Sequence, residues 1–504
     1  MDDKFHRYNL VTRLTHLVAS VLLITLYATG LRLAWFSGSS PLFDAGSVLD
    51  RLLPTGQVYN WHMILGMLLL GCGLFYLVDL ILSGQTGRLT ALFTDRKRDY
   101  RKKLFYIFMF ADTAVIIVSG IGLYMGTYQG AGGHTFMKGM HHYSMALLAM
   151  LMIVHFIDIL LGKQTRWNSI FFGYLPKRPL SRRSTIAAGV IGLIFGLALW
   201  MLVSSPVTLV STLIERQPVI DGWVTDRVWT ECDPVRLQTA AGANFDAGVS
   251  EVTIKSFHNS NTVFFLIQWH DADRSFNRHL IKEESGWSVR VSEYPNLFGE
   301  SVYFEDKLAL SFHRTSGGCA ATCHVGVRKK MGLHYTAGDT ADLWQWRALS
   351  TNPIQRADDG WWTSDDNDSL GGRHLDNLAS GGYFENLNTD WQQPYFLPTH
   401  PMVRHWIDPR LEHVTPYFGA EDSFSIGAQI PAVIVTQFKG DRGDVRAMGR
   451  WEDGVWTVEL ARPLRTGSSF DVDLRGETYM GVALFDNAAG KHAFHLRPVK
   501  LVVE

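Results

Sequence analysis

Glutamate is missing from the first 206 residues of this 504-residue chain. That part holds 19 Lys and Arg against nine Asp, a net charge of +10, whereas residues 207–504 hold 28 basic and 39 acidic side chains, a net charge of −11. The near-neutral total of −1 therefore hides two parts of opposite character. Such a chain is unlike a disordered, collagen-like or coiled-coil protein. The basic residues stand in short loops between apolar runs and form no exposed basic domain, which counts against nucleic-acid binding.

Several enzyme signatures are missing as well. The chain has no phosphate-binding P-loop, no dinucleotide fingerprint, no hydrolase triad and no molybdenum-binding pattern. Any substrate chemistry therefore belongs to a separate subunit, and the positive features of this chain must be sought elsewhere.

Five apolar runs are long enough to cross the hydrocarbon core of a membrane, which is ~30 Å thick and takes about 20 helical residues. They cover residues 14–35, 62–82, 104–126, 141–162 and 185–206. The first run is too long for a cleaved signal peptide, has no small-residue cleavage site after it and carries His16. We interpret it as an uncleaved signal anchor.

The loops between these runs predict the orientation of the chain. Lys and Arg gather in the N-terminal arm and in the second and fourth loops, whereas the first and third loops offer only Arg51 and Lys138. By the positive-inside rule the N-terminus is cytoplasmic. Five spans then place the C-terminal part in the periplasm of a bacterium. We predict a multi-pass protein of the inner membrane, in contact with lipid, with a membrane domain at 1–184, a fifth span and tether at 185–215, and a periplasmic domain at 216–504.

Histidine inside a span is energetically costly and usually functional. His16 lies near the cytoplasmic end of the first span and His62 opens the second on the periplasmic side, while His141 and His142 open the fourth and His155 lies toward its cytoplasmic end. On one helix His141 and His155 differ by about 40° in azimuth and about 21 Å in height. One helix face thus offers one ligand to each leaflet, which favours His141 over its neighbour His142.

Matching depths give two pairs, His16 with His155 near the cytoplasm and His62 with His141 near the periplasm. Paired imidazoles at fixed depth in a bundle are what two bis-histidine b-type haems require. The alternatives are histidines that only hydrogen-bond between helices, or histidines that relay protons.

The segments FHRYNLVTRLTHLVASVLLITLYATGLRL (5–33) and HHYSMALLAMLMIVHFIDILLG (141–162) resemble the opening and the fourth span of the cytochrome b subunits of nickel–iron hydrogenases and formate dehydrogenases. The resemblance covers residues 5–175. It implies two haems b in a four-helix core and exchange of electrons with quinone. The fifth span is extra to that family and looks like a tether.

The part from residue 216 onward predicts strands. VSEVTIKSFHNSNTVFFLIQWHDADRS (249–275) alternates apolar and polar residues around an Asn-rich turn, and residues 454–464 and 478–487 repeat the pattern. Residues 350–420 are rich in Gly, Asp, Asn, Pro and Trp and predict long loops. We therefore expect a membrane all-α bundle of five transmembrane helices, followed by an all-β antiparallel sandwich domain with long loops.

Two of the four cysteines form a motif. Cys319, Cys323 and His324 make up Cys-Ala-Ala-Thr-Cys-His, a rarer spacing of the haem c attachment motif, in which two thioethers hold the haem and the histidine ligates iron. A periplasmic location fits, because haem c is attached there. A local disulfide, a disulfide between Cys323 and Cys232, and a metal site are the alternatives.

The second axial ligand of the outer haem has several candidates, each of which can equally be a plain surface residue. Met331 follows the motif, and Lys491, His492 and His495 lie in the segment GKHAFHLRP near the end of the chain.

The strings IDGWVTDRVW (220–229), FLIQWHDADRS (265–275) and ADLWQWRAL (341–349) resemble the ethylbenzene-dehydrogenase-type haem-binding domain, the cytochrome c-552/DMSO reductase-like γ-subunit class of periplasmic molybdenum oxidoreductases. The resemblance spans residues 216–502. It implies a β-sandwich that holds one haem b between Met and Lys, positions that Met331 and Lys491 match. The added Cys-x-x-x-Cys-His departs from the γ subunits and favours His324 with Met331 or with a C-terminal histidine.

These features predict a membrane-anchored multihaem electron-transfer cytochrome. It would pass electrons between the quinone pool and a periplasmic redox protein, such as a soluble cytochrome or a molybdenum oxidoreductase, through two haems b and an outer haem that is c-type or a non-covalent haem b. Quinol oxidation is the favoured direction. The alternatives are a membrane-anchored module that binds or senses a small ligand, and a stand-alone quinol-linked oxidoreductase.

Overall fold

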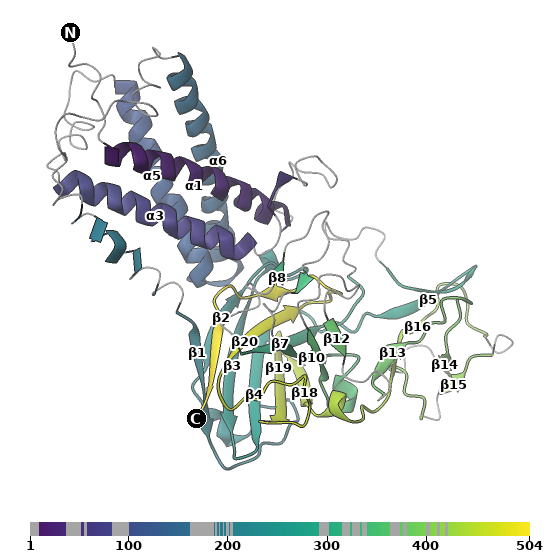
Figure 1. Cartoon of the computed structure of the whole chain (residues 1–504). Coiled ribbons are helices and arrows are strands. Elements are labelled where there is room, and N and C mark those ends of the chain that lie inside the picture. The colour runs from purple at the N-terminus through teal and green to yellow at the C-terminus, as the bar shows by residue number, and fades with distance from the viewer. Residues whose placement is uncertain are drawn as a thin grey trace, which may run out of the picture. The chain divides into compact units, whose positions relative to one another are not determined.

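The computed structural model contains two compact units, Met1–Ser205 and Pro206–Glu504 (Figure 1). It describes residues 10–36, 52–54, 58–82, 100–161, 205–291, 302–314, 340–362, 381–399, 404–410, 414–418 and 422–504, together with isolated positions between 186 and 201 and the pairs or triplets 323–324, 333–334 and 373–375. Each unit is described by itself.

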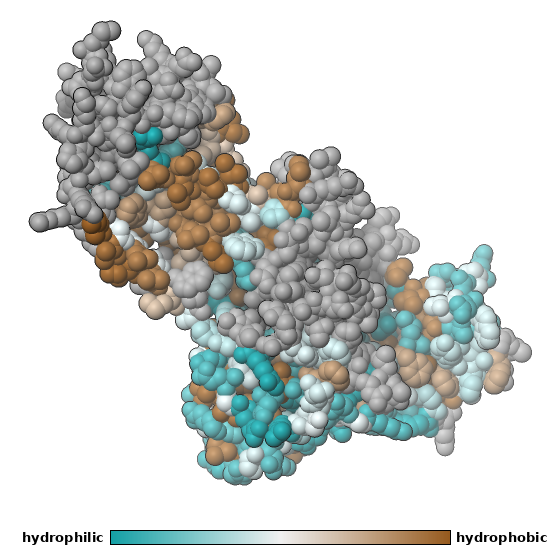
Figure 2. Space-filling view, viewed as in Figure 1, coloured by the Kyte–Doolittle hydropathy of each residue, from teal (hydrophilic) through white to brown (hydrophobic). Residues whose placement is uncertain are grey.

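Four long helices make up the first unit. They are α1 (Leu10–Phe36), α3 (Val58–Leu82), α5 (Tyr100–Met125) and α6 (Gly130–Leu161). All four are long and apolar enough to cross a membrane. Their outer faces carry large apolar side chains such as Ile24, Val118 and Ile153, each at least 60% exposed, and Figure 2 shows this surface as hydrophobic. In water such a surface would be unfavourable, so these faces suit contact with lipid.

The helix α6 begins earlier than the apolar run predicted. Its residues 130–140 include four glycines, His134 and Lys138, which interrupt the hydropathy that marks a span. Helical hydrogen bonds nevertheless continue through this segment, and Lys138 lies within α6, whereas the sequence placed it in the third loop. Hydropathy therefore located the membrane-crossing part of this helix but not its beginning.

The helices associate as two pairs that contact each other. α1 packs along α3, and α5 packs along α6. The hydroxyl of Tyr27 in α1 donates a hydrogen bond to the carbonyl of Met145 in α6, with an O···O distance of 2.8 Å. The fully buried Arg32 of α1 donates to the carbonyls of Leu53 and Pro54, each at 2.9 Å. Both interactions satisfy polar groups that would otherwise be buried without a partner.

The predicted fifth span, residues 185–206, lies mostly outside the described residues. Its described part includes Gly192, where a Cβ atom would stand 3.3 Å from the Cβ of Phe75 in α3. Glycine at this position thus permits a close approach to α3. The fifth span itself stays a prediction.

The second unit is rich in β-structure, and its largest sheet has 13 strands. In spatial order these are β12 (Arg373–Leu375), β11 (Asp358–Trp362), β10 (Ala341–Arg347), β7 (Lys307–His313), β20 (Gly476–Phe485), β22 (Val499–Val503), β1 (Val207–Leu213), β3 (Ser250–His258), β4 (Thr262–His270), β19 (Val455–Pro463) and β18 (Arg446–Glu452), with β2 (Val235–Thr239) beside β3 and β21 (Ala493–Phe494) beside β20.

Four small sheets complete this unit. They join β16 (Gln429–Pro431), β5 (His279–Glu283) and β6 (Gly286–Val289); β13 (Tyr383–Glu385) and β17 (Val433–Val435); β14 (Phe396–Pro398) and β15 (Val414–Pro416); and β8 (Cys323–His324) and β9 (Leu333–His334). The segment predicted as long loops, residues 350–420, therefore contributes several short strands.

The strand pattern at 249–275 is confirmed. It forms β3 and β4, joined by a turn in which the side-chain oxygen of Asn259 accepts hydrogen bonds from the amides of Asn261 at 3.0 Å and Thr262 at 2.8 Å. An Asn side chain that holds the next two or three amides is a common way to close such a turn. The later patterns become β19 and β20.

The strand β1 departs from the predicted organisation in two ways. Residues 207–213 were assigned to the tether, yet they pair in parallel with β22 along Val207–Ser211 and with β3 at Thr212 and Leu213. The sheet is thus not wholly antiparallel. Because this strand directly follows an apolar run, its own alternation is too short to separate it from the run by sequence.

Aromatic side chains from distant strands share one core. Ring centroids of Phe265 in β4 and Phe312 in β7 are 5.8 Å apart, and Trp346 of β10 lies 6.1 Å from Trp269 of β4 and 4.9 Å from Trp456 of β19. Strands β4 and β19 therefore face β7 and β10 across this core. Such rings contribute both buried area and specific packing geometry.

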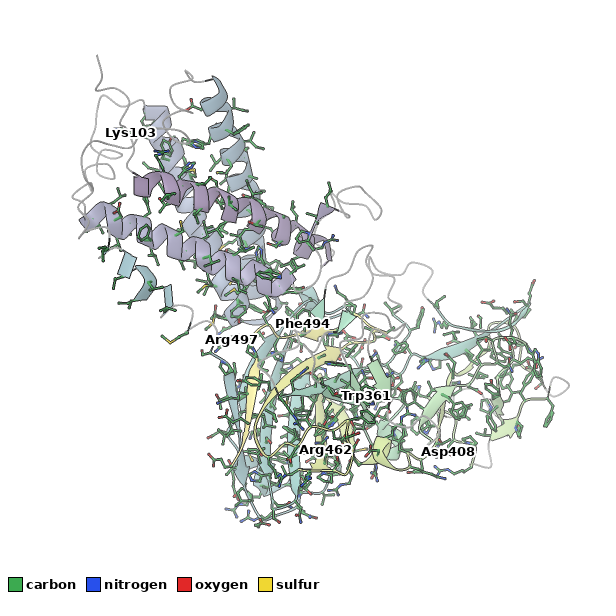
Figure 3. All side chains as sticks on the ribbon, viewed as in Figure 1. Lys103, Trp361, Asp408, Arg462, Phe494 and Arg497 are labelled. Atoms are coloured by element: carbon green, nitrogen blue, oxygen red, sulfur yellow. The ribbon has the colours of Figure 1, made fainter. Side chains whose placement is uncertain are left out.

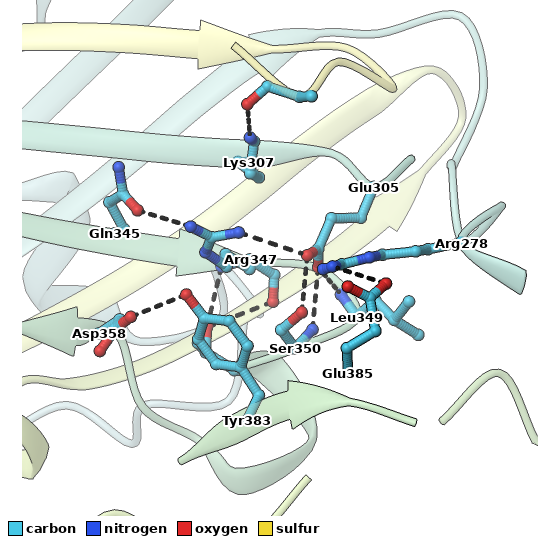
Figure 4. Close-up of polar contacts among 12 residues, drawn as sticks. Arg278, Glu305, Lys307, Gln345, Arg347, Leu349, Ser350, Asp358, Tyr383 and Glu385 are labelled. Carbon is cyan, nitrogen blue, oxygen red and sulfur yellow. Dashed lines mark hydrogen bonds and ion pairs between the residues drawn. The ribbon is translucent and has the colours of Figure 1, made fainter. Parts of the chain in front are cut away.

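Buried carboxylates tie segments of this unit together. The fully buried Glu305 accepts hydrogen bonds from the amides of Leu349 and Ser350, both at 2.9 Å, and from the Ser350 hydroxyl at 2.6 Å (Figure 4). Arg347 lies 3.7 Å from the same carboxylate. In the same way Glu459 of β19 accepts from the Trp229 indole at 2.8 Å. Three donors per carboxylate compensate the loss of water.

We predict that Gly449→Ala destabilises this unit. A Cβ atom at Gly449 in β18 would stand 2.2 Å from Cζ2 of the fully buried Trp346, which cannot move without disturbing two other indoles. The free energy of unfolding should fall by about 2–3 kcal/mol, measured by denaturant titration with tryptophan fluorescence. Gly467→Ala is the control, because a Cβ there meets nothing within 4 Å. Equal effects of the two changes would contradict the steric explanation.

Candidate functional site

Two histidine pairs bridge the helices at two depths. His16 of α1 and His155 of α6 have ring centroids 6.3 Å apart, with 50° between the ring planes. His62 of α3 and His141 of α6 also have centroids 6.3 Å apart, with 83° between the planes. The structure therefore brings together the two pairs that the sequence proposed, and α6 contributes one imidazole to each.

The distance between the ring centroids of each pair can be compared with the distance expected for two imidazoles that bind one metal ion. Two imidazoles that bind one metal from opposite sides, each with about 2 Å between nitrogen and metal, have ring centroids about 6 Å apart. Both pairs match this value. Ordinary aromatic pairs also cover this distance, about 4.5–7 Å between centroids, so the hydrogen bonds of the rings must decide between the two explanations.

The hydrogen bonds of the Thr29 hydroxyl are the basis for assigning which nitrogen of His62 carries the proton. Thr29 donates its only hydroxyl hydrogen to the carbonyls of Thr25 and Leu26 in its own helix, both at 3.0 Å. Its oxygen lies 2.8 Å from Nδ1 of His62, and with that hydrogen engaged on the carbonyls we assign Nδ1–H as the donor to it. The Nε2 atom of His62 is then unprotonated, which is the form that ligates a metal.

The same arrangement recurs at His141. The hydroxyl of Ser119 donates to the carbonyl of Val115 at 2.6 Å, and its oxygen lies 3.2 Å from Nδ1 of His141. That nitrogen also lies 3.1 Å from the carbonyl of Ile116, which can only accept. Nδ1 of His141 is thus a donor, and its Nε2 is left with a lone pair.

A glycine follows each of these hydroxyl residues and lets the imidazole approach. A Cβ at Gly30 would stand 3.2 Å from Cε1 of His62, and a Cβ at Gly120 would stand 3.0 Å from Cε1 of His141. The dipeptides Thr29-Gly30 and Ser119-Gly120 therefore form two matching supports on α1 and α5. The sequence reasoning missed them, although a hydroxyl-glycine dipeptide in each of two spans was a readable signal.

The surroundings of the other pair are aromatic. Phe105 of α5 stacks on His155 with centroids 6.2 Å apart and 19° between the planes, and Tyr106 meets it edge-on at 6.3 Å. Among the described residues, Nδ1 of His16 has no hydrogen-bond partner. Beside this pair lies an apolar hollow of about 450 Å³, whose wall includes Phe105 together with Tyr100, Leu104, Phe108, Leu147 and Leu151.

His142, the alternative to His141, is the neighbour of that ligand candidate along α6. Its ring centroid is 6.4 Å from that of His141, with 51° between the planes. The hydroxyl and glycine support described above belongs to His141, which is the partner that the structure gives to His62.

The cysteine motif of the second unit lies largely outside the described residues. Cys319 and Met331 fall outside them, and of Cys323 and His324 only the backbone is described, as strand β8. In its register Cys323 stands opposite His334. Cys232 is a free, buried thiol whose sulfur lies 3.4 Å from the carbonyl of Val228. Because the Cys323 side chain lies outside the described residues, a disulfide between Cys232 and Cys323 stays among the alternatives.

The C-terminal ligand candidates differ in their contacts. His495 is 2% exposed, its Nε2 accepts a hydrogen bond from the amide of Val482 at 3.0 Å, and its Nδ1–H donates to the carbonyl of Arg497 at 2.5 Å. Because both nitrogens are engaged in this structure, we interpret His495 as a structural residue and favour the other candidates as distal ligand. Nδ1 of His492 lies 2.9 Å from the carbonyl of Gly490, and the backbone carbonyl of Lys491 accepts from Ala243.

A further histidine pair in the second unit was not found by sequence reasoning. His279 of β5 and His405 have ring centroids 6.2 Å apart, with 45° between the planes. Both nitrogens of His279 and Nδ1 of His405 are buried without a hydrogen-bond partner among the described residues. Burial lowers the pKa of His279 to about 4, so the ring is neutral at pH 7. The residues are 126 positions apart, and no local spacing signals the pair.

Two family models match the chain. The model described as ethylbenzene dehydrogenase matches residues 226–497, more than half of the chain, and the model described as prokaryotic cytochrome b561 matches residues 7–173. The two matches fall in different compact units. No curated protein matches the chain.

Solved structures add little. The chain is similar to a family 9 carbohydrate binding module from Caldicellulosiruptor kristjanssonii, in complex with glucose (10% identity, 59% of this chain and 96% of that chain, TM-score 0.24) and in complex with cellotriose (9% identity, 60% and 95%, TM-score 0.23). Similarities of this size carry no argument about the fold or the function of this chain.

We predict that His495→Leu destabilises the second unit without affecting metal content. The buried amide of Val482 would lose its acceptor, so the free energy of unfolding should fall by about 2 kcal/mol. Denaturant unfolding and haem content per protein would be measured together. The exposed His270 offers the control, His270→Leu, which should change stability by less than about 0.5 kcal/mol. A loss of haem in His495→Leu with stability unchanged would show instead that His495 is a haem ligand.

Proposed function

This chain belongs to the ethylbenzene dehydrogenase family, and it carries a prokaryotic cytochrome b561 domain N-terminal to the family region. From this combination we propose that it is a membrane-anchored multihaem electron-transfer cytochrome. The cytochrome b561 family implies membrane electron transfer with haem b. In detail, we propose that the helical unit holds two haems b and that the β-rich unit holds an outer haem. The protein would exchange electrons with the quinone pool and with a periplasmic redox partner, such as a soluble cytochrome or a molybdenum oxidoreductase.

The observation that carries this proposal is the repeated geometry of the histidines. Two pairs on three helices, α1, α3 and α6, have the same centroid spacing of 6.3 Å, and both rings of one pair are held with Nδ1 as donor. His16 with His155, and His62 with His141, would each hold one haem b, which supplies reversible one-electron transfer when bound. Histidines that served only to hydrogen-bond between helices would engage both ring nitrogens, whereas among the described residues only Nδ1 of His62 and of His141 has a polar partner.

Thr29 and Ser119 act as positioning residues in this scheme. Each hydroxyl oxygen accepts a hydrogen bond from Nδ1–H of an imidazole. This contact fixes both the tautomer and the orientation of the imidazole ring. Outer partners of this kind tune the basicity of a ligating histidine. Gly30 and Gly120 then let each ring sit against the neighbouring helix.

The apolar hollow beside His155 supports exchange with a quinone. Its volume of about 450 Å³ and its lining by Phe, Leu and Tyr side chains suit an apolar ring. Phe105 belongs both to this wall and to the stack on His155, so a molecule in the hollow would lie one side chain away from that imidazole.

The outer haem has two candidate ligand sets. The first rests on sequence, with Cys319 and Cys323 as thioether positions, His324 as proximal ligand, and Met331, Lys491 or His492 as distal ligand. The second rests on geometry, because His279 and His405 reproduce the spacing of the membrane pairs. Covalent attachment separates the two, since only the first set contains cysteine.

Orientation and direction are also part of the proposal. The basic loops of the helical unit favour a cytoplasmic N-terminus in a bacterial inner membrane, and together with the predicted fifth span at 185–206 this puts the acidic second unit in the periplasm. An acidic surface would attract a basic redox partner and speed their encounter. We therefore favour quinol oxidation, with electrons leaving toward the periplasm.

We predict that His141→Ala and His155→Ala each remove one of the two haems b, about half of the non-covalent haem. His142→Ala, one position away on the same helix, is the matched control and should keep both. A pyridine haemochrome assay on protein purified in mild detergent measures haem per chain.

Two outcomes would count against this proposal. Loss of haem in His142→Ala but not in His141→Ala would reverse the pairing. No b-type absorption in the wild-type protein would favour the module that merely binds or senses a small ligand.

We predict that the double change Cys319→Ser with Cys323→Ser abolishes covalent haem, because each of the two thioethers needs a cysteine sulfur. Haem staining of the denatured chain on a gel measures the covalent fraction. Cys232→Ser changes a thiol that is free and buried, and it should leave the stain unchanged. If all haem of the wild-type protein is extracted by acidic acetone, the thioether assignment is wrong, and His279→Phe with His405→Phe becomes the deciding pair of variants.

A further inference from the structure

The β-rich unit contains a group of buried carboxylates that the electron-transfer proposal does not use. Oxygens of Asp342, Asp359 and Asp471 all lie within 4.8 Å of one another. Asp342 of β10 and Asp359 of β11 are fully buried, and the Asp471 side chain is 3% exposed. We propose that these three carboxylates bind a hard divalent cation, Ca²⁺ in the first place.

The hydrogen bonds of the group leave its inner oxygens without partners. Oδ2 of Asp342 accepts from the amide of Val472 at 3.1 Å and from Arg462, and Oδ2 of Asp471 accepts from the Thr466 hydroxyl at 2.6 Å. By contrast, Oδ1 of Asp342 and both oxygens of Asp359 accept no hydrogen bond from the described residues. A fully buried carboxylate without any donor is strongly unfavourable, so these oxygens point to a missing ligand.

The charge of the group indicates the charge of that ligand. Arg462 of β19, which is fully buried and labelled in Figure 3, contacts Asp342 and lies 3.6 Å from Asp471. The three inner carboxylates and one guanidinium leave a formal charge of −2, to which the adjoining Asp441 and Asp444 add, so the group calls for a cation.

The donor set selects the kind of cation. All inner donors are carboxylate oxygens, which suit Ca²⁺ or Mg²⁺, whereas Zn²⁺ prefers nitrogen and sulfur. The inner oxygens lie within 4.8 Å of one another, close enough for all three carboxylates to contact one ion. Ca²⁺ accepts irregular sets of carboxylate oxygens, whereas Mg²⁺ demands near-ideal octahedral geometry, so Ca²⁺ is the first ion to test.

A second acidic group adjoins the first and offers an approach from the surface. Asp441, Asp444 and Asp471 also have oxygens within 4.8 Å of one another, so Asp471 belongs to both groups. Asp441 lies in the 3₁₀ turn Asp441–Gly443, and Asp444 follows it. Both are partly exposed, whereas Asp359 is fully buried. A cation could therefore pass from water to the inner site along a path of carboxylates.

Aromatic side chains hold the segments that supply the ligands. Trp361, two residues after Asp359, stacks on Phe470, the neighbour of Asp471, with centroids 4.4 Å apart and 5° between the planes. Arg462 lies over Trp344 at 4.8 Å. The cation would thus join β10 and β11 to the segment before β20, which packing already brings together.

The rival explanation is proton sharing. Asp444 lies close enough to Asp359 for a proton to bridge their carboxyl groups, which would also reduce the negative charge. The two explanations differ in what Ca²⁺ does, because a bridged pair of acids has no need of the ion.

The test uses the full chain in detergent, stripped of metal with a chelator and then titrated with Ca²⁺. Saturating Ca²⁺ should raise the thermal unfolding midpoint of the β-rich unit by about 5 °C. Tb³⁺ in place of Ca²⁺ should luminesce when excited through tryptophan, because Trp344 and Trp361 adjoin the site, and Ca²⁺ should quench this signal by competition. Neither readout depends on haem or on electron transfer, so failure here would leave the proposed function standing.

Matched variants localise the effect. Asp359→Asn and, if that variant does not fold, Asp471→Asn should abolish both responses. Asp473→Asn is the control, because Asp473 lies two residues from Asp471 but pairs with the exposed Arg475. No Ca²⁺-dependent shift in the wild-type chain would overturn the proposal in favour of proton sharing. A shift that survives in Asp359→Asn and Asp471→Asn would also overturn it, since the ion would then bind elsewhere.

Discussion

The need to partner every buried polar group is the constraint on which both units depend. In the helical unit it is met locally: Thr29 and Ser119 give their hydrogens to carbonyls of their own helices and then receive Nδ1–H from His62 and His141. This chain of donors decides the tautomer of each imidazole. It leaves Nε2 as the reactive nitrogen, and it does so on two different helices in the same way. The ligand geometry therefore follows from backbone hydrogen bonding inside each span.

The same constraint shapes the β-rich unit, where charges are buried between strands. The buried charges of Glu305 and Glu459 are compensated, because backbone amides, a hydroxyl and an indole donate hydrogen bonds to them. Two of their donors, Trp229 and Leu349, lie in the strings that resemble a haem-binding family, so part of that resemblance reflects how the fold is tied together. Where donors are too few, as at Asp359 and His279, the shortage itself marks a position for a metal or another ligand.

Individual elements show how far sequence reasoning carried. Hydropathy located four helices, and alternation located β3, β4, β19 and β20, because both patterns arise within one segment. The beginning of α6 was missed, since glycines and Lys138 lower hydropathy without ending a helix. The strand β1 was missed because its partners β22 and β3 lie far along the chain. The fifth span and the cysteine motif lie mostly outside the described residues and stay predictions.

By itself the sequence determined the class of protein, the helical spans and the histidines that pair by depth, because the 1.5 Å rise and 100° turn of a helix translate spacing into position. Tertiary structure decided what depends on contacts between distant segments. Only the tertiary structure shows the hydroxyl and glycine supports of His62 and His141 and the hydrogen bonds of both nitrogens of His495. It also places His279 beside His405, and Asp342 beside Asp359 and Asp471. Such contacts join strands and helices far apart in the chain, and local spacing carries no record of them.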